Sequence, residues 1–162
     1  MAGWRASCEV AFSLSTYPTG KSVREALWPT LCWNQGSRRD HYSPANEEVG
    51  QAFEEWYEIL TSGDTVDNTW KRINLLQTMF AYPGLINSTS PLSTTTKGYL
   101  AAVPYTSKAG DIIALLSGGD VPFVLRPMGD HYRLVGHCYV HGIMNGEAFT
   151  DNAEELEWFS IR

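Results

Sequence analysis

The chain has 162 residues, of which 43% are hydrophobic and 19% charged, and its formal net charge is -6. This length suits one compact domain over residues 1–162, and the composition argues against disorder. The acidic balance disfavours a nucleic-acid partner, and the lack of a long apolar run disfavours a signal peptide or membrane association, so we expect a cytoplasmic protein.

Helical patterns occupy residues 1–84. Residues 4–14 carry apolar side chains at helical spacing, and Ser22 followed by Glu25 forms a capping-box pattern for a second helix. Pro29 lies inside that second pattern, so it predicts either a kink or the start of another helix. Residues 34–45 are rich in Gly, Ser, Arg, Asp and Pro, which is typical of a loop.

Two longer helices are expected next. Asn46 has the chemistry of an N-cap, and the stripe that follows it comprises Val49, Phe53, Trp56, Tyr57 and Leu60. A further helix from Asp64 or Thr65 to Phe80 would complete an antiparallel helical hairpin. The Ser/Thr/Pro-rich stretch 85–96 is predicted to be a linker, and a loop of that length often borders a functional opening.

Residues 97–149 read as short strands separated by glycines. Runs at 111–116, 121–125 and 132–140 are joined by Ser-Gly-Gly-Asp and Met-Gly-Asp turns, which have hairpin chemistry. About five short strands would curl together to remove exposed edges. The predicted fold is therefore α+β, with an N-terminal helical layer packed on a small antiparallel β-barrel or curled sheet. Residues 150–162 form a tail with one helical turn over 152–158.

The densest polar cluster is His137-Cys138-Tyr139-Val140-His141. A strand rises ~3.3 Å per residue, which places the two histidines ~13 Å apart, too far to share one ion. We therefore predict no metal site, and because no phosphate loop or dinucleotide fingerprint is present, we also predict no cofactor. Cys8, Cys32 and Cys138 are odd in number and far apart, which indicates reduced, mostly buried thiols.

A polar spot inside an apolar cavity is the predicted site. Its expected catalytic residues are His137, Tyr139 and Arg126, which could polarise a carbonyl or carboxylate on a hydrophobic ligand. Two alternatives stay open: Arg126 could form only an ion pair with Asp111, Asp120 or Asp130, and His141 could simply close its strand with a hydrogen bond. The expected ligand-binding residues are Trp56, Tyr99, Phe123, His141 and Met144.

Four strings carry a family resemblance: ALWPTLCWNQGSR, KGYLAAVP, GDIIALLSGGDVPFVLRP and YRLVGHCYVHGIMNGE. Over most of its length the chain resembles the C-terminal region of fungal heterokaryon-incompatibility (HET domain) proteins, here without the HET domain. The family's usual string has Glu where this chain has His137 and Asp where it has Asn145. The resemblance implies a fold and a fungal origin, and it supplies no catalytic residues.

Three functions are weighed against each other. The first is a stand-alone cofactor-free cyclase or isomerase of fungal secondary metabolism, of pericyclic, Diels-Alder type, whose partner is a small apolar polyene or terpenoid metabolite; His137 replacing a carboxylate suggests such reuse. The second is a non-catalytic protein-interaction module derived from the incompatibility system, which needs an exposed apolar patch. The third is a structural remnant. Nothing in the sequence indicates the oligomeric state.

Overall fold

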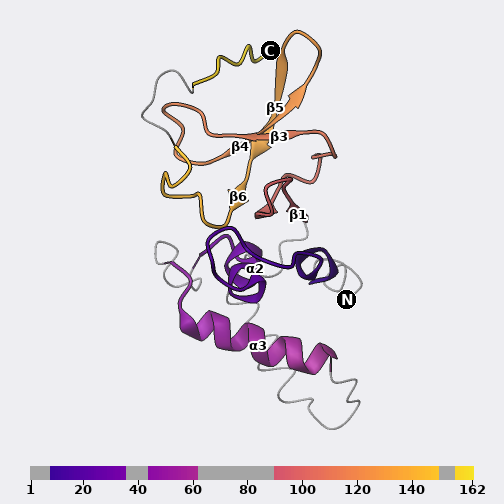
Figure 1. Ribbon diagram of the computed structural model, residues 1–162, viewed down its shortest axis with the longest axis vertical. Coiled ribbons are helices and arrows are strands. Elements are labelled where there is room, and N and C mark those ends of the chain that lie inside the picture. The colour runs from indigo at the N-terminus through magenta and orange to yellow at the C-terminus, as the bar shows by residue number, and fades with distance from the viewer. Residues whose placement is uncertain (1–7, 36–43, 62–89, 150–155) are drawn as a thin grey trace.

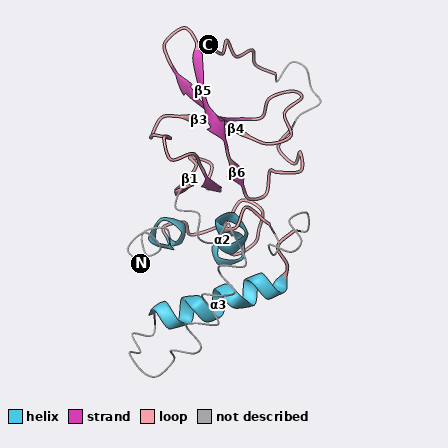
Figure 2. Ribbon diagram, turned by 180° about the vertical axis from the view of Figure 1, so that it is seen from behind, coloured by secondary structure: helices cyan, strands magenta, loops and turns pink. Residues whose placement is uncertain are grey.

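The computed structural model describes residues 8–35, 44–61, 90–149 and 156–162. Its helices gather at one end of the molecule and its strands at the other (Figure 1). The view from behind shows the same two layers (Figure 2). The predicted α+β class, with a helical layer against a curled antiparallel sheet, is therefore confirmed; the described strands do not form a closed barrel. The extent of the domain, 1–162, stays a prediction.

The helices described are a short segment at residues 8–12, α2 (Val23–Leu31) and α3 (Glu47–Thr61). α2 begins at the predicted capping box: the Ser22 side chain accepts from the Glu25 N–H, and the Glu25 carboxylate accepts from the Ser22 N–H. Pro29 lies within the last turn without ending the helix, which runs to Leu31. The expected helix from 64 to 80 lies outside the described residues.

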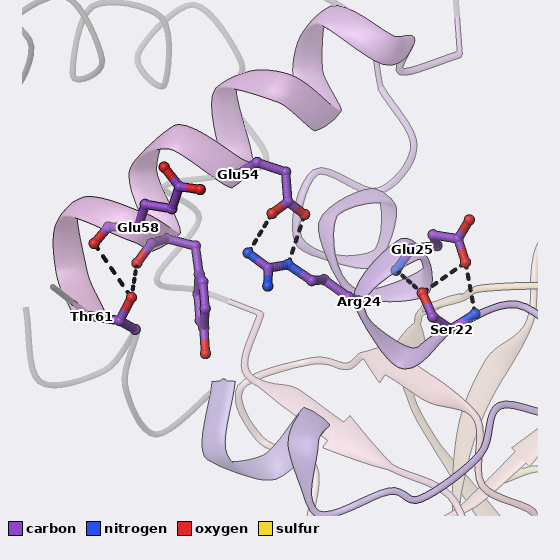
Figure 3. A network of polar contacts seen from close by, with 7 residues as sticks. Ser22, Arg24, Glu25, Glu54, Glu58 and Thr61 are labelled. Atoms are coloured by element: carbon purple, nitrogen blue, oxygen red, sulfur yellow. Dashed lines mark hydrogen bonds and ion pairs between the residues drawn. The ribbon is translucent and has the colours of Figure 1, made fainter.

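α2 and α3 pack through a buried apolar contact with a polar margin. Leu27 and Phe53 are buried between them, as the predicted stripe on α3 requires. At the margin, Arg24 forms an ion pair with Glu54 and lies over the Tyr57 ring at 4.5 Å (Figure 3 shows the ion pair). Because this pair is half exposed, the buried side chains supply most of the stabilisation.

The strands form two three-stranded antiparallel sheets. One has the order β1-β2-β6, with β1 at Leu92–Thr94, β2 at Leu100–Ala102 and β6 at Tyr139–Val140. The other has the order β3-β4-β5, with β3 at Ile112–Ala114, β4 at Phe123–Pro127 and β5 at Tyr132–His137. The predicted three-strand meander is thus confirmed in the second sheet.

Two strand predictions differ from the structure. The run at 132–140 is not one strand: β5 pairs with β4, the chain passes through buried Cys138, and β6 then pairs with β2. Cys138 stays tied to the β3-β4-β5 sheet, because its N–H donates at 2.9 Å to the carbonyl of Pro122, the residue before β4. The linker predicted at 85–96 contains β1, which pairs with β2 in register.

Two apolar cores meet at β2. Leu100 belongs to the core that contains the helical side chains, whereas Ala101 belongs to the core between the two sheets. Alternation along a strand explains this division, since successive side chains point to opposite faces. β2 therefore connects the helical layer to the curled sheet.

The chain end described at 156–162 pairs with Tyr132, the first residue of β5. Tyr132 donates its N–H to Ser160 and accepts from the Arg162 N–H, at 2.7 and 2.9 Å. Residues 156–158 are not helical, so the helical turn predicted over 152–158 is absent from its described part. Among the described residues, no helix is long and apolar enough to span a bilayer.

Candidate functional site: a groove at the open seam of the curled sheet

In the part of the chain that the structure describes, the two sheets are joined on one side only. The chain links β5 to β6 through Cys138, which leaves β1 and β3 as the two ends of a continuous order β1-β2-β6, β5-β4-β3. A groove of about 1010 Å³ lies at this seam. We call it the seam groove. It is lined chiefly by Pro91–Lys97 and Ser107–Ile113, together with Tyr99, Ala101, Val103, Leu115, Val124, Val140, Ile143 and Ala148.

β1 presents unpaired backbone groups to the seam. The Val103 N–H donates to Pro91 and the Thr95 N–H donates to Tyr99, so alternate residues of β1 are bonded to β2. In an antiparallel ladder, the residues between these have N–H and C=O groups that point the other way. Leu92 and Thr94 therefore offer their backbone groups to the outer edge, within the part of the chain that the structure describes.

β3 has the same property. The Cys138 N–H donates to the Pro122 carbonyl, and the Met128 N–H donates to the His131 carbonyl. The even-numbered residues of β4 therefore direct their backbone N–H and C=O groups toward β5. Phe123 and Leu125 then pair with β3, leaving the backbone groups of Ile113 outward. Because both ends of the sheet order carry such groups, the seam groove is flanked by strand edges that can accept another strand.

The wall beside β3 is held by one ion pair. Arg126 donates to both carboxylate oxygens of Asp111 at 2.8 Å and to the Thr106 carbonyl at 2.7 Å. The hydrogen bond from Arg126 lowers the pKa of Asp111. Asp111 also accepts from the Lys108 N–H at 2.8 Å. The Asp111 carboxylate is thus neutralised by Arg126, and its hydrogen bonds hold the wall of the groove together.

Two lysines and one hydroxyl group of the groove have no ion-pair or hydrogen-bond partner for their side chains among the described residues. Lys97 and Lys108 line the groove, and their ammonium groups form no ion pair among the described residues. The Ser107 hydroxyl oxygen is buried and has no hydrogen-bond partner in the described chain. The rim is therefore locally basic on a chain whose net charge is -6.

The three predicted catalytic residues do not meet at one point. His137 is exposed at the end of β5, with its ring against Trp33 at 5.4 Å between centroids. Arg126 is occupied by Asp111, the first of the ion-pair alternatives. Tyr139 is buried, and its hydroxyl lies 3.1 Å from His141 Nδ1.

His141 belongs to a buried polar junction between the helices and the sheet. The Tyr17 hydroxyl donates to the His141 carbonyl at 2.8 Å and accepts from the Leu100 N–H at 3.2 Å. Burial raises the pKa of Tyr17 to about 12 and lowers the pKa of His141. Tyr17 thus bridges the two backbone groups at which the β2–β6 ladder ends, which is a structural role.

Of the predicted ligand-binding residues, Tyr99 lines the seam groove. Met144 accepts the Val140 N–H at its sulfur, and Phe123 packs over Gly119; neither lines the groove. The side chain of Trp56 lies outside the described residues. Four further lining residues were not predicted: Ser93, Lys97, Lys108 and Ile113. The Ser/Thr/Pro-rich stretch 85–96 was predicted to border a functional opening, and its described part does line the groove.

A curled antiparallel sheet on a helical layer, open along one seam, defines a small β-barrel-like domain with a groove suited to binding. Comparison with known families makes this specific: residues 39–161 match the model of the Het-6 beta-barrel domain, so the chain belongs to that family. Over 71 residues it is 38% identical to Heterokaryon incompatibility protein 6, OR allele, of Neurospora crassa. That match covers 41% of the chain and 10% of the relative's length. No solved structure matches the chain.

Family membership confirms the resemblance seen in the sequence and corrects the first functional prediction. The cyclase or isomerase of fungal secondary metabolism was wrong, because both the family and the curated relative belong to heterokaryon incompatibility. The prediction depended on His137, which replaces the glutamate of the family's usual string and was therefore expected to take part in catalysis. His137 stands at the exposed end of β5 against an indole ring, away from the groove.

Proposed function

We propose that the chain is a non-catalytic protein-interaction module of the heterokaryon-incompatibility system and that the seam groove receives the partner. The observation that carries this proposal is the groove itself, with a volume of about 1010 Å³ and, on either side, a strand edge that no described strand pairs with. Exposed edges of this kind are a common means of recruiting another chain.

The inner surface of the groove supports the proposal. Ser93 pairs with Ala101, and Ala101 pairs with Val140, so these side chains form one row across the first sheet. All three line the groove, and Ile113 and Val124 line it from the second sheet. An apolar floor with hydroxyl groups at its rim suits a protein segment that carries both kinds of side chain.

The test fills the groove without disturbing either core. Ser93→Phe adds a ring in the groove, whereas Ser117→Phe adds the same ring at the exposed turn between β3 and β4. Each variant replaces the natural gene in a fungus that carries it, and forced heterokaryons are scored for the incompatibility reaction. We expect the reaction to be lost with Ser93→Phe and kept with Ser117→Phe, at equal protein levels. A normal reaction with Ser93→Phe would overturn the proposal.

A further inference from the structure

The geometry points to a specific mode of recognition: we propose that the seam groove binds an extended, acidic segment of a partner protein as an added strand on the free edge of β1. This inference rests on the proposed function and deepens it. It names the conformation of the bound segment, the backbone groups that hold it and the sign of its charge.

The conformation follows from the edge of β1. Leu92 and Thr94 direct their N–H and C=O groups away from β2, as the bonds of Pro91 and Thr95 require. Pro91–Lys97 line the groove, and the open edge is the part of this wall that β1, Leu92–Thr94, forms. A partner in extended conformation satisfies these groups and places alternate side chains on the groove floor.

Apolar residues at alternate positions of the bound segment fit that floor. Side chains that point inward would meet Ala101 and Val140 from the first sheet and Ile113 from the second. An alternating segment therefore matches the apolar floor with its inward side chains.

The charge of the segment follows from the rim. Lys97 and Lys108 line the groove without ion-pair partners in the described part of the chain, while the Asp111 carboxylate is already held by Arg126. Acidic residues at the outward positions of the segment would face these lysines. A basic segment would be repelled at the same place.

The binding experiment uses the full chain and a short capped peptide of alternating valine and glutamate as the probe. Controls are the valine–lysine analogue and a valine–glutamate peptide whose backbone nitrogens are methylated at every second residue. Titration calorimetry gives affinity, and amide NMR spectra follow Leu92 and Thr94. We expect the acidic peptide to bind and to protect both amides from exchange, and both control peptides to bind more weakly by about tenfold or more.

A proline substitution tests whether the backbone N–H at the edge of β1 contributes to binding. Thr94→Pro removes the outward N–H, and proline is tolerated on an edge strand where that group is not bonded. Thr94→Val removes only the hydroxyl and keeps the N–H. We expect about tenfold weaker binding by Thr94→Pro and a clearly smaller loss by Thr94→Val, because the valine variant keeps the outward N–H. Replacing both Lys97 and Lys108 with glutamine should weaken binding and reduce its salt dependence.

Several outcomes would overturn strand addition: no binding of the acidic peptide, equal affinity for the methylated peptide, or equal affinity of Thr94→Pro and the natural chain. If Thr94→Pro fails to fold, the methylated peptide and the amide protection of the natural chain decide the question. Failure here, combined with loss of the incompatibility reaction in Ser93→Phe, would leave the interaction module standing and remove only this mode of binding. A normal reaction in Ser93→Phe would remove the module itself.

Discussion

Tyr17→Phe tests how the helical layer is joined to the sheet. The substitution removes one hydroxyl and keeps a ring that packs near the Tyr99 and His141 rings, at 6.0 and 5.8 Å between centroids. It leaves the Leu100 N–H, in a residue that is 0% exposed, and the His141 carbonyl without the partner they share. A buried backbone group without a partner costs about 1–3 kcal/mol, so we expect the free energy of unfolding to fall by that amount.

Urea denaturation followed by fluorescence measures this loss, with Tyr105→Phe as the control. Tyr105 is 77% exposed and belongs to neither core, so its substitution should change stability by less than about 0.5 kcal/mol. A loss below about 0.5 kcal/mol for Tyr17→Phe would refute the reasoning. It would mean that the Leu100 N–H bonds directly to the His141 carbonyl once the hydroxyl is gone, in addition to the existing bond from the His141 N–H to the Leu100 carbonyl.

The stability lost in Tyr17→Phe should depend on pH in the alkaline range. Burial raises the pKa of Tyr17 from 10.0 to about 12, so the folded state keeps a proton that the unfolded chain loses first. This contribution to stability is complete below about pH 10 and is lost as the pH rises toward about 12. The stability difference between the natural chain and Tyr17→Phe should therefore shrink over that interval. A difference that stays constant with pH would contradict this role of the hydroxyl.

Two further substitutions test the same junction. Gly142 has φ +94°, and a Cβ there would lie 2.5 Å from the Thr19 methyl group. Gly118 has φ +79°, and a Cβ there would have no atom within 4 Å. Gly142→Ala should therefore lower the free energy of unfolding more than Gly118→Ala does, as measured by chemical denaturation. We expect about 1 kcal/mol for Gly118→Ala and about 1–3 kcal/mol more for Gly142→Ala; equal losses would contradict the contact. Burial lowers the pKa of His141 from 6.5, so stability should fall as the pH drops below 6.5, and His141→Gln, measured across the same range, should reduce that slope. An unchanged slope would show that other groups cause it.

The local parts of the fold could be predicted from the sequence. The capping box at Ser22, the described part of the stripe on α3 and the hairpins of the β3-β4-β5 meander depend on neighbouring residues, and each is present. β1 could not be predicted in this way, because Leu-Ser-Thr lacks a clear alternation. Its strand conformation depends on pairing with β2, which is information that the local sequence does not contain.

The site was harder to predict because it depends on contacts that are distant in the sequence. The bond from Tyr17 to His141 spans 124 positions, and no spacing rule connects them. Residue type also misled: Arg126 and His137 have catalytic chemistry, yet one is bound to Asp111 and the other contacts Trp33. Chemistry-bearing residues point to a site only when the fold leaves their polar atoms uncommitted.

The position of the seam follows from the route of the chain through Cys138. Because β6 pairs with β2, and β5 pairs with β4, the single connection between β5 and β6 fuses the two sheets at that point. β1 and β3 are then necessarily the outer strands of the combined order, although 17 positions separate the end of one from the beginning of the other. A direct β1–β3 pairing would close the sheet and bury its edges, so the open seam is where a partner strand can supply what the chain's own strand order leaves unpaired.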